Sequence, residues 1–87
     1  MNYTVLWKPA AQQELAQLWI NAADRNALAA AADLIDALLK TDPQSQGESR
    51  HRDMRILICL PLVVNFKVSE PDRTVLVSDV WLWGRHP

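Results

Sequence analysis

Residues 54–83, MRILICLPLVVNFKVSEPDRTVLVSDVWLW, decide the fold. Apolar side chains alternate with others along three runs of this stretch, and a period of two is typical of β-strands. Pro61 separates the first two runs, and the tetrad Glu70–Arg73, with proline at the favoured second position of a turn, separates the last two. The stretch therefore predicts three consecutive strands joined by tight turns.

The alternation also predicts two faces. We expect helices to cover Met54, Ile56, Ile58, Val64, Phe66, Val68, Leu76, Val80 and Leu82. The uncovered face is then expected to present Arg55, Asn65, Lys67, Val77, Asp79, Trp81 and Trp83.

The first half of the chain predicts a strand followed by a helix. Residues 2–8 are rich in β-branched and aromatic types, and Pro9 suits the first turn of a helix. One helical face then follows from the spacing of Ala11, Leu15, Leu18, Trp19 and Ala22. Both Trp7 and Trp19 fit the core by period, and the solvent side is expected to hold Gln12, Gln13, Glu14 and Gln17.

A second helix is predicted after Asp24, a good N-cap residue. Its apolar stripe is Leu28, Ala31, Ala32, Ile35, Leu38 and Leu39. Asp36 and Lys40 have the spacing of a helical ion pair, and Pro43 ends the helix at Asp42, before a polar loop over residues 41–49.

These elements predict an α+β domain over residues 1–87, in the order β-α-α-β-β-β. The short connection between the helices favours an antiparallel helical hairpin. An antiparallel sheet with that hairpin packed on one face buries both apolar surfaces.

Composition excludes several classes of function. The chain has 87 residues, a net charge of −1 and one cysteine, Cys59, so we expect no disulfide framework. With His51 and His86 at no recognised ligand spacing, we expect no metal, and we also expect no cofactor and no small-molecule ligand. Neither a signal peptide nor an apolar stretch long enough to span a membrane is present, which favours a cytoplasmic location.

Two chemistries remain open on the uncovered face. RNA cleavage needs a base, an acid and a cation, and the candidates are Arg55, Lys67, Asp79, Arg85 and His86. The alternative is a solvated face on which Arg55 and Asp79 pair across strands. Trp81 and Trp83 indicate a partner interface or a region covered by a chain end.

The whole chain resembles the RelE/ParE superfamily of type II toxin–antitoxin toxins. The resemblance is carried by YTVLWKPAAQQEL at residues 3–15, Arg55–Leu57, Val64–Val68 and the tail Trp83–Pro87, which is similar to a His–Gly–Arg–Arg ending. It implies the fold predicted above.

The resemblance implies one of two activities. RelE-like members cut messenger RNA on the ribosome, and ParE-like members inhibit DNA gyrase. Val63 stands at the position of the arginine that stabilises the transition-state phosphate, and residues 44–53 replace the lysine-rich segment with only Arg50 and Arg52. The departures favour the ParE-like subgroup, with a role in plasmid stabilisation and no catalytic residues.

Two alternatives are kept. A RelE-like ribosome-dependent endoribonuclease would use Arg55, Lys67, Arg85 and His86 on ribosome-bound mRNA, and a decayed toxin would retain only antitoxin binding. In the ParE-like reading the partners are a cognate antitoxin and gyrase. The residues expected to contact a partner are Trp81, Trp83, Arg55, Lys67 and Arg85.

Overall fold

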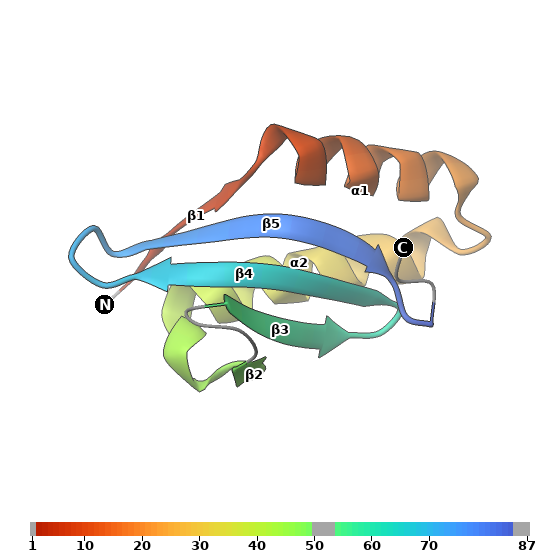
Figure 1. Ribbon diagram of the computed structural model, residues 1–87. Helices are drawn as coiled ribbons and strands as arrows, with labels where there is room; N and C mark the ends of the chain where they lie inside the picture. The colour runs from red at the N-terminus through yellow and green to blue at the C-terminus, as the bar shows by residue number, and fades with distance from the viewer. Residues whose placement is uncertain (1, 50–53, 85–87) are drawn as a thin grey trace.

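The computed structural model describes residues 2–49 and 54–84 (Figure 1). Its elements are β1 (Thr4–Trp7), α1 (Pro9–Asn21), α2 (Arg25–Thr41), the 3-10 helix η1 (Pro43–Ser45), β2 (Glu48–Ser49), β3 (Met54–Cys59), β4 (Leu62–Ser69) and β5 (Thr74–Leu82). The predicted order β-α-α-β-β-β is confirmed. The segment predicted as a polar loop additionally contains η1 and the two-residue strand β2.

The sheet is mixed, with the strand order β1-β5-β4-β3-β2. Strands β2 to β5 pair antiparallel, as predicted for the three long strands, whereas β1 runs parallel to β5. The expectation of a wholly antiparallel sheet is therefore corrected at β1. Parallel neighbours need a long crossover connection, and the chain between β1 and β5 contains both helices.

The helix ends follow the sequence signals. Pro9 begins α1, and the Asp24 side chain accepts a hydrogen bond from the Ala27 amide at 3.0 Å at the start of α2. Asp36 and Lys40 form the predicted ion pair at 3.2 Å. Arg25 adds a contact that the sequence did not predict, because its Nε donates to the Trp19 carbonyl at 3.0 Å and so satisfies an acceptor in the last turn of α1.

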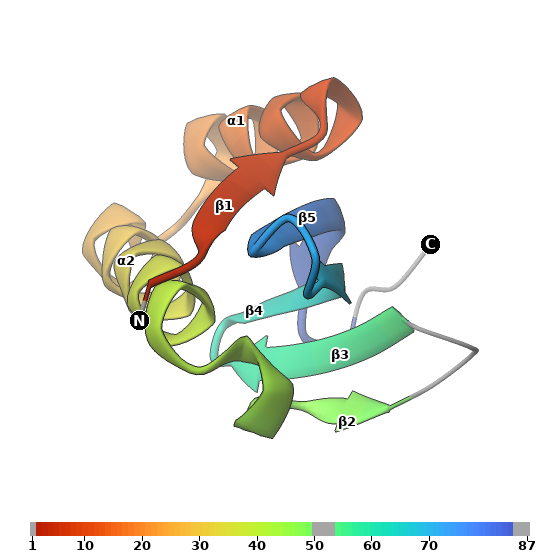
Figure 2. The same ribbon diagram turned by 90° about the vertical axis from the view of Figure 1, so that its left-hand side faces the viewer.

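Both helices lie on one side of the sheet (Figure 2). α2 contributes Leu28, Ala31, Ile35 and Leu39 to the core, and α1 contributes Ala11. Trp7 packs against this cluster as predicted. Trp19 does not, since 42% of its surface is exposed and its ring lies 5.9 Å from the Arg25 guanidinium.

The predicted faces are correct for β4 and wrong for β3. Phe66 and Val64 are fully buried under the helices, but the β3 residues of that core are Leu57 and Cys59, and Ile58 is exposed. The reason is the two-residue turn at Leu60–Pro61, which places Cys59 opposite Leu62. Directly opposed residues share a face, so Met54, Ile56 and Ile58 lie on the other side of the sheet.

A β-bulge changes the faces along β5. Asn65 is opposite Asp79 and Phe66 is opposite Val77, so Ser78 is an extra residue on β5. Val75 and Val77 point into the core before the bulge, and Val80 and Leu82 after it. The prediction for Val80 and Leu82 is confirmed, whereas the predicted places of Leu76 and Val77 are reversed.

Candidate functional site

The sheet face away from the helices holds part of the predicted polar set. Lys67 and Asp79 are exposed there, and Asn65 lies directly opposite Asp79. The Oδ1 atom of Asn65 is buried and has no hydrogen-bond partner among the described residues. Val63, at the position of the nuclease arginine, lies on this face opposite Trp81 and is only 2% exposed.

Arg55 does not belong to this face, which corrects the prediction. It stands opposite Phe66 in the β3–β4 pairing, on the same side as the buried Leu57. Its Nε donates to the Gln46 carbonyl at 3.0 Å and so ties the segment after η1 to β3. The pairing therefore places Arg55 and Lys67 on opposite faces of the sheet.

The candidate nuclease set is accordingly not assembled by the described residues. Of Arg55, Lys67, Arg85 and His86, Lys67 alone is described on the open face; Arg85 and His86 lie outside the described residues. No group of three or more His, Cys, Asp or Glu side chains that could hold a metal ion occurs within residues 2–49 and 54–84.

The two tryptophans also occupy different surfaces. Trp81 is half-buried on the open face, opposite Val63. Trp83 follows the end of β5, where its amide donates to the Pro61 carbonyl at 2.9 Å, and it is 61% exposed. The single surface predicted for Trp81, Trp83, Arg55 and Lys67 is therefore divided among different parts of the molecule.

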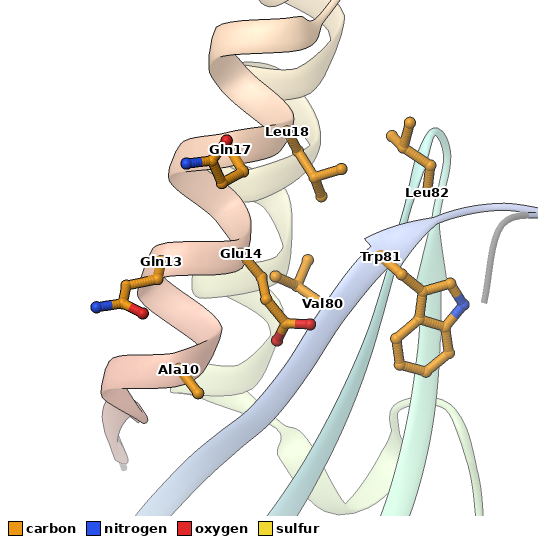
Figure 3. A pocket seen from close by; sticks show the side chains of 8 residues that line it. All are labelled: Ala10, Gln13, Glu14, Gln17, Leu18, Val80, Trp81 and Leu82. Atoms are coloured by element: carbon orange, nitrogen blue, oxygen red, sulfur yellow. The ribbon is translucent and has the colours of Figure 1, made fainter. Parts of the chain in front are cut away.

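The sequence did not predict a groove that lies between α1 and the second half of β5 (Figure 3). Its volume is about 810 Å³. Its walls are Ala10, Gln13, Glu14, Gln17 and Leu18 on α1, and Val80, Trp81 and Leu82 on β5. Most of this surface is apolar, so the groove exposes carbon to solvent beside a strand.

Glu14 is the charged residue among the described residues that line this groove. Figure 3 shows it reaching from α1 towards β5, whereas Gln13 and Gln17 point away. Its Oε1 is buried and has no hydrogen-bond partner in the described chain. The spacing of Ala11, Glu14 and Leu18, three and four residues apart, places Glu14 at the edge of the buried helix face, and this signal corrects its predicted place in solvent.

A second cavity of about 690 Å³ adjoins the groove and shares Leu18 and Leu82 with it. It lies between the α1–α2 connection and the β3–β4 turn, and Trp83, Leu60 and Pro61 form one wall. Asp24 is its one charged lining residue in the described chain. The two cavities therefore form a continuous apolar surface with two acidic residues.

The titratable groups with displaced pKa values lie elsewhere. Hydrogen bonds from Gln44 and Tyr3, each 2.7 Å from Glu70 Oε2, hold the pKa of Glu70 below its usual range. The hydrogen bond between Tyr3 and Glu70 also raises the pKa of Tyr3. Tyr3, Gln44 and Glu70 together join the start of β1 to the β4–β5 turn. Separately, burial raises the pKa of the Cys59 thiol.

No protein-family model matches the chain, and no curated protein matches it. Solved structures do match. The toxin–antitoxin complex RelBE2 from Mycobacterium tuberculosis has a TM-score of 0.79 at 19% identity, covering 94% of this chain and 92% of that one. The chromosomal ParDE toxin–antitoxin system from P. aeruginosa has a TM-score of 0.68 at 14% identity, covering 92% and 95%.

The chain therefore has the fold of the RelE/ParE toxins. The same fold also matches TrmO from Pseudomonas aeruginosa, with a TM-score of 0.62 and 21% identity over 92% of this chain but only 35% of TrmO. A fold shared with a part of another protein does not by itself define a function. Neither helix of the described chain is long and apolar enough to cross a membrane.

Proposed function

We propose that this chain, as a single domain over residues 1–87, is the toxin of a type II toxin–antitoxin pair. The supporting observation is the fold match over more than nine-tenths of both chains to RelBE2 and ParDE. Its partner is a small cognate antitoxin, and it acts in the cytoplasm.

Within this proposal, the toxin is ParE-like: it inhibits DNA gyrase by binding and contributes to plasmid stabilisation. Acid–base cleavage of RNA needs several converging polar side chains. Here Val63 is apolar and buried at the position of the nuclease arginine, and Arg55 is held by Gln46 on the face opposite Lys67. These observations argue against the RelE-like arrangement.

The partner contacts are proposed at Trp81 and Trp83, with Lys67 and Arg85 in the outer part of the contact. An exposed indole such as that of Trp83 offers a large apolar area to a partner, and tryptophan is enriched among residues that dominate binding energy. Arg55 is left out because it lies on the sheet face opposite Lys67, where its Nε donates to the Gln46 carbonyl.

The RelE-like endoribonuclease is kept as a second candidate for one reason. The RelBE2 complex gives the higher of the two TM-scores, 0.79 against 0.68 for ParDE. In that case Lys67 on the open face, together with Arg85 and His86, would act on ribosome-bound mRNA.

Inducible expression of the chain alone separates these functions. Growth arrest with a DNA-damage (SOS) response supports gyrase inhibition, whereas arrest with immediate loss of protein synthesis and cleaved transcripts supports the endoribonuclease. Absence of arrest at a confirmed protein level indicates a decayed toxin. Co-expression of the small protein encoded by the adjacent reading frame is expected to restore growth, and Phe66→Ala serves as a destabilised control.

A further inference from the structure

The groove exists because β1 covers only half of β5. β1 pairs with β5 from Thr74 to Val77, and the Lys8 amide then donates to the Val77 carbonyl at 2.9 Å. After Pro9 the chain continues as α1, which runs beside the rest of β5 as a helix. Within the described chain, no strand pairs with Asp79–Leu82 on this edge.

An uncovered strand edge has specific binding chemistry. Alternate residues direct their N–H and C=O groups to opposite edges of a strand, so Asp79–Leu82 offers both donors and acceptors towards the groove. An extended peptide can satisfy these groups by adding as a further strand. Leu18 and Leu82 would then contact its apolar side chains, because both are half-buried and line the groove beside that edge.

The groove also selects the charge of its occupant. Glu14 has a buried, unpartnered carboxylate oxygen in the groove, and Asp24 lines the adjoining cavity. Neither cavity is lined by a described Lys, Arg or His. A buried carboxylate oxygen is costly without a donor, and a lysine or arginine supplies a charge-assisted hydrogen bond.

We propose that this groove binds an extended, basic segment of the antitoxin, which adds a strand to β5 at Asp79–Leu82 and places a lysine or arginine against Glu14. The segment continues into the cavity at Trp83, because the two cavities share Leu18 and Leu82. This inference rests on the proposed toxin function and names the surface through which the antitoxin binds. It adds the groove to the contacts proposed above at Trp81 and Lys67.

Titration calorimetry with the purified product of the adjacent reading frame tests the site. Ala10→Trp fills the groove from α1 and is expected to weaken binding at least tenfold, while Ala16→Trp, an exposed α1 position that does not line it, is expected to change binding less than twofold. Glu14→Lys is expected to weaken binding tenfold or more, and Asp33→Lys, an equal charge change on exposed α2, less than twofold.

Amide hydrogen exchange tests the strand. Groove-facing amides within residues 79–82 are expected to exchange at least tenfold more slowly in the complex. Full-strength binding by Ala10→Trp, or unchanged exchange at residues 79–82, would overturn the groove proposal while leaving the toxin function intact. Absence of any complex with the wild-type chain would instead overturn the proposed toxin–antitoxin function. A dimer of this chain that Ala10→Trp abolishes would assign the groove to a second copy and overturn its assignment to the antitoxin.

Discussion

The two halves of β5 have different neighbours. From Thr74 to Val77 the strand lies between β1 and β4, so both of its edges are paired. From Asp79 to Leu82 it is paired with β4, and its other edge faces the groove beside α1. The bulge at Ser78 stands between the halves. One strand therefore serves the core along its whole length and offers a binding edge along half of it.

The largest effect is expected at Phe66, which lies opposite Val77 at the junction of the halves and is fully buried. Phe66→Ala should cost about 3–5 kcal/mol of unfolding free energy, because it removes the largest buried side chain and leaves a cavity. Urea denaturation measures the loss. Leu60→Ala, at an exposed turn position, should cost less than about 0.5 kcal/mol. Equal losses for the two variants would contradict a core that continues across the junction.

Trp83→Ala tests whether the half of β5 that has an unpaired edge contributes to antitoxin binding. This residue follows β5 and lines the cavity next to the groove. Its truncation should weaken antitoxin binding about 30-fold, which corresponds to about 2 kcal/mol. The fold should persist, since the side chain is mostly exposed. Calorimetry against Trp19→Ala provides the control, because Trp19 is also exposed but lines neither cavity. An unchanged affinity for Trp83→Ala would place the contact elsewhere.

A pair of threonine variants tests the position of the bulge. Val77→Thr should cost about 1–3 kcal/mol, because it places a hydroxyl in the core. Leu76→Thr should cost less, because Leu76 is half-buried on the open face and threonine suits a strand. Thermal or urea unfolding ranks the two. The reverse ranking would mean that the alternation runs through Ser78 without interruption.

The smallest effect concerns the paired end of β5, where Glu70 joins the β4–β5 turn to Tyr3 and Gln44. The pKa of Glu70 is lowered by folding, so its stabilising contribution is present above the ordinary glutamate pKa of about 4.3 and is lost as the pH falls through the folded-state value. Below about pH 5, wild-type stability should fall more steeply than that of Glu70→Gln. Tyr3→Phe, which removes one donor, should show an intermediate slope. Identical slopes in unfolding experiments would contradict this role.

Periodicity predicted the elements well but located their faces less well. Helix signals at Pro9, Asp24 and Asp42 were local and sufficient. The faces of β3 and β5 depended on pairing across strands. The length of the turn at Leu60–Pro61 determines which residues of β3 face the helices, and the extra residue Ser78 determines which residues of β5 do so. β3 is apolar on both faces, so its sequence alone fits either register.

The candidate site was harder to predict for the same reason. Arg55 follows the face of β3, so the error in that face moved it away from Lys67. The groove is formed by α1 and β5, which are far apart in the sequence, and by the early end of β1. The spacing of Glu14 from Ala11 and Leu18 indicated that it lies at the edge of the buried face of α1. No neighbouring residue indicated that β5 would lie opposite it.

The bulge at Ser78 also affects how this sequence can change over evolutionary time. In an uninterrupted strand, the side chains at every second position point to the same face of the sheet. An insertion or deletion of one residue therefore exchanges the buried and exposed positions along the rest of the strand. In β5 the bulge takes up one extra residue at Ser78, so Val77 before it and Val80 after it both point into the core. Deleting Ser78 would join Val77 directly to Asp79 and restore an uninterrupted alternation, in which Val80 and Leu82 still point into the core and keep their partners on β4. Deleting a single residue between Asp79 and Leu82 would instead exchange the two faces along the rest of the strand. Position 78 is therefore a place where β5 can lose a residue without exchanging its buried and open faces.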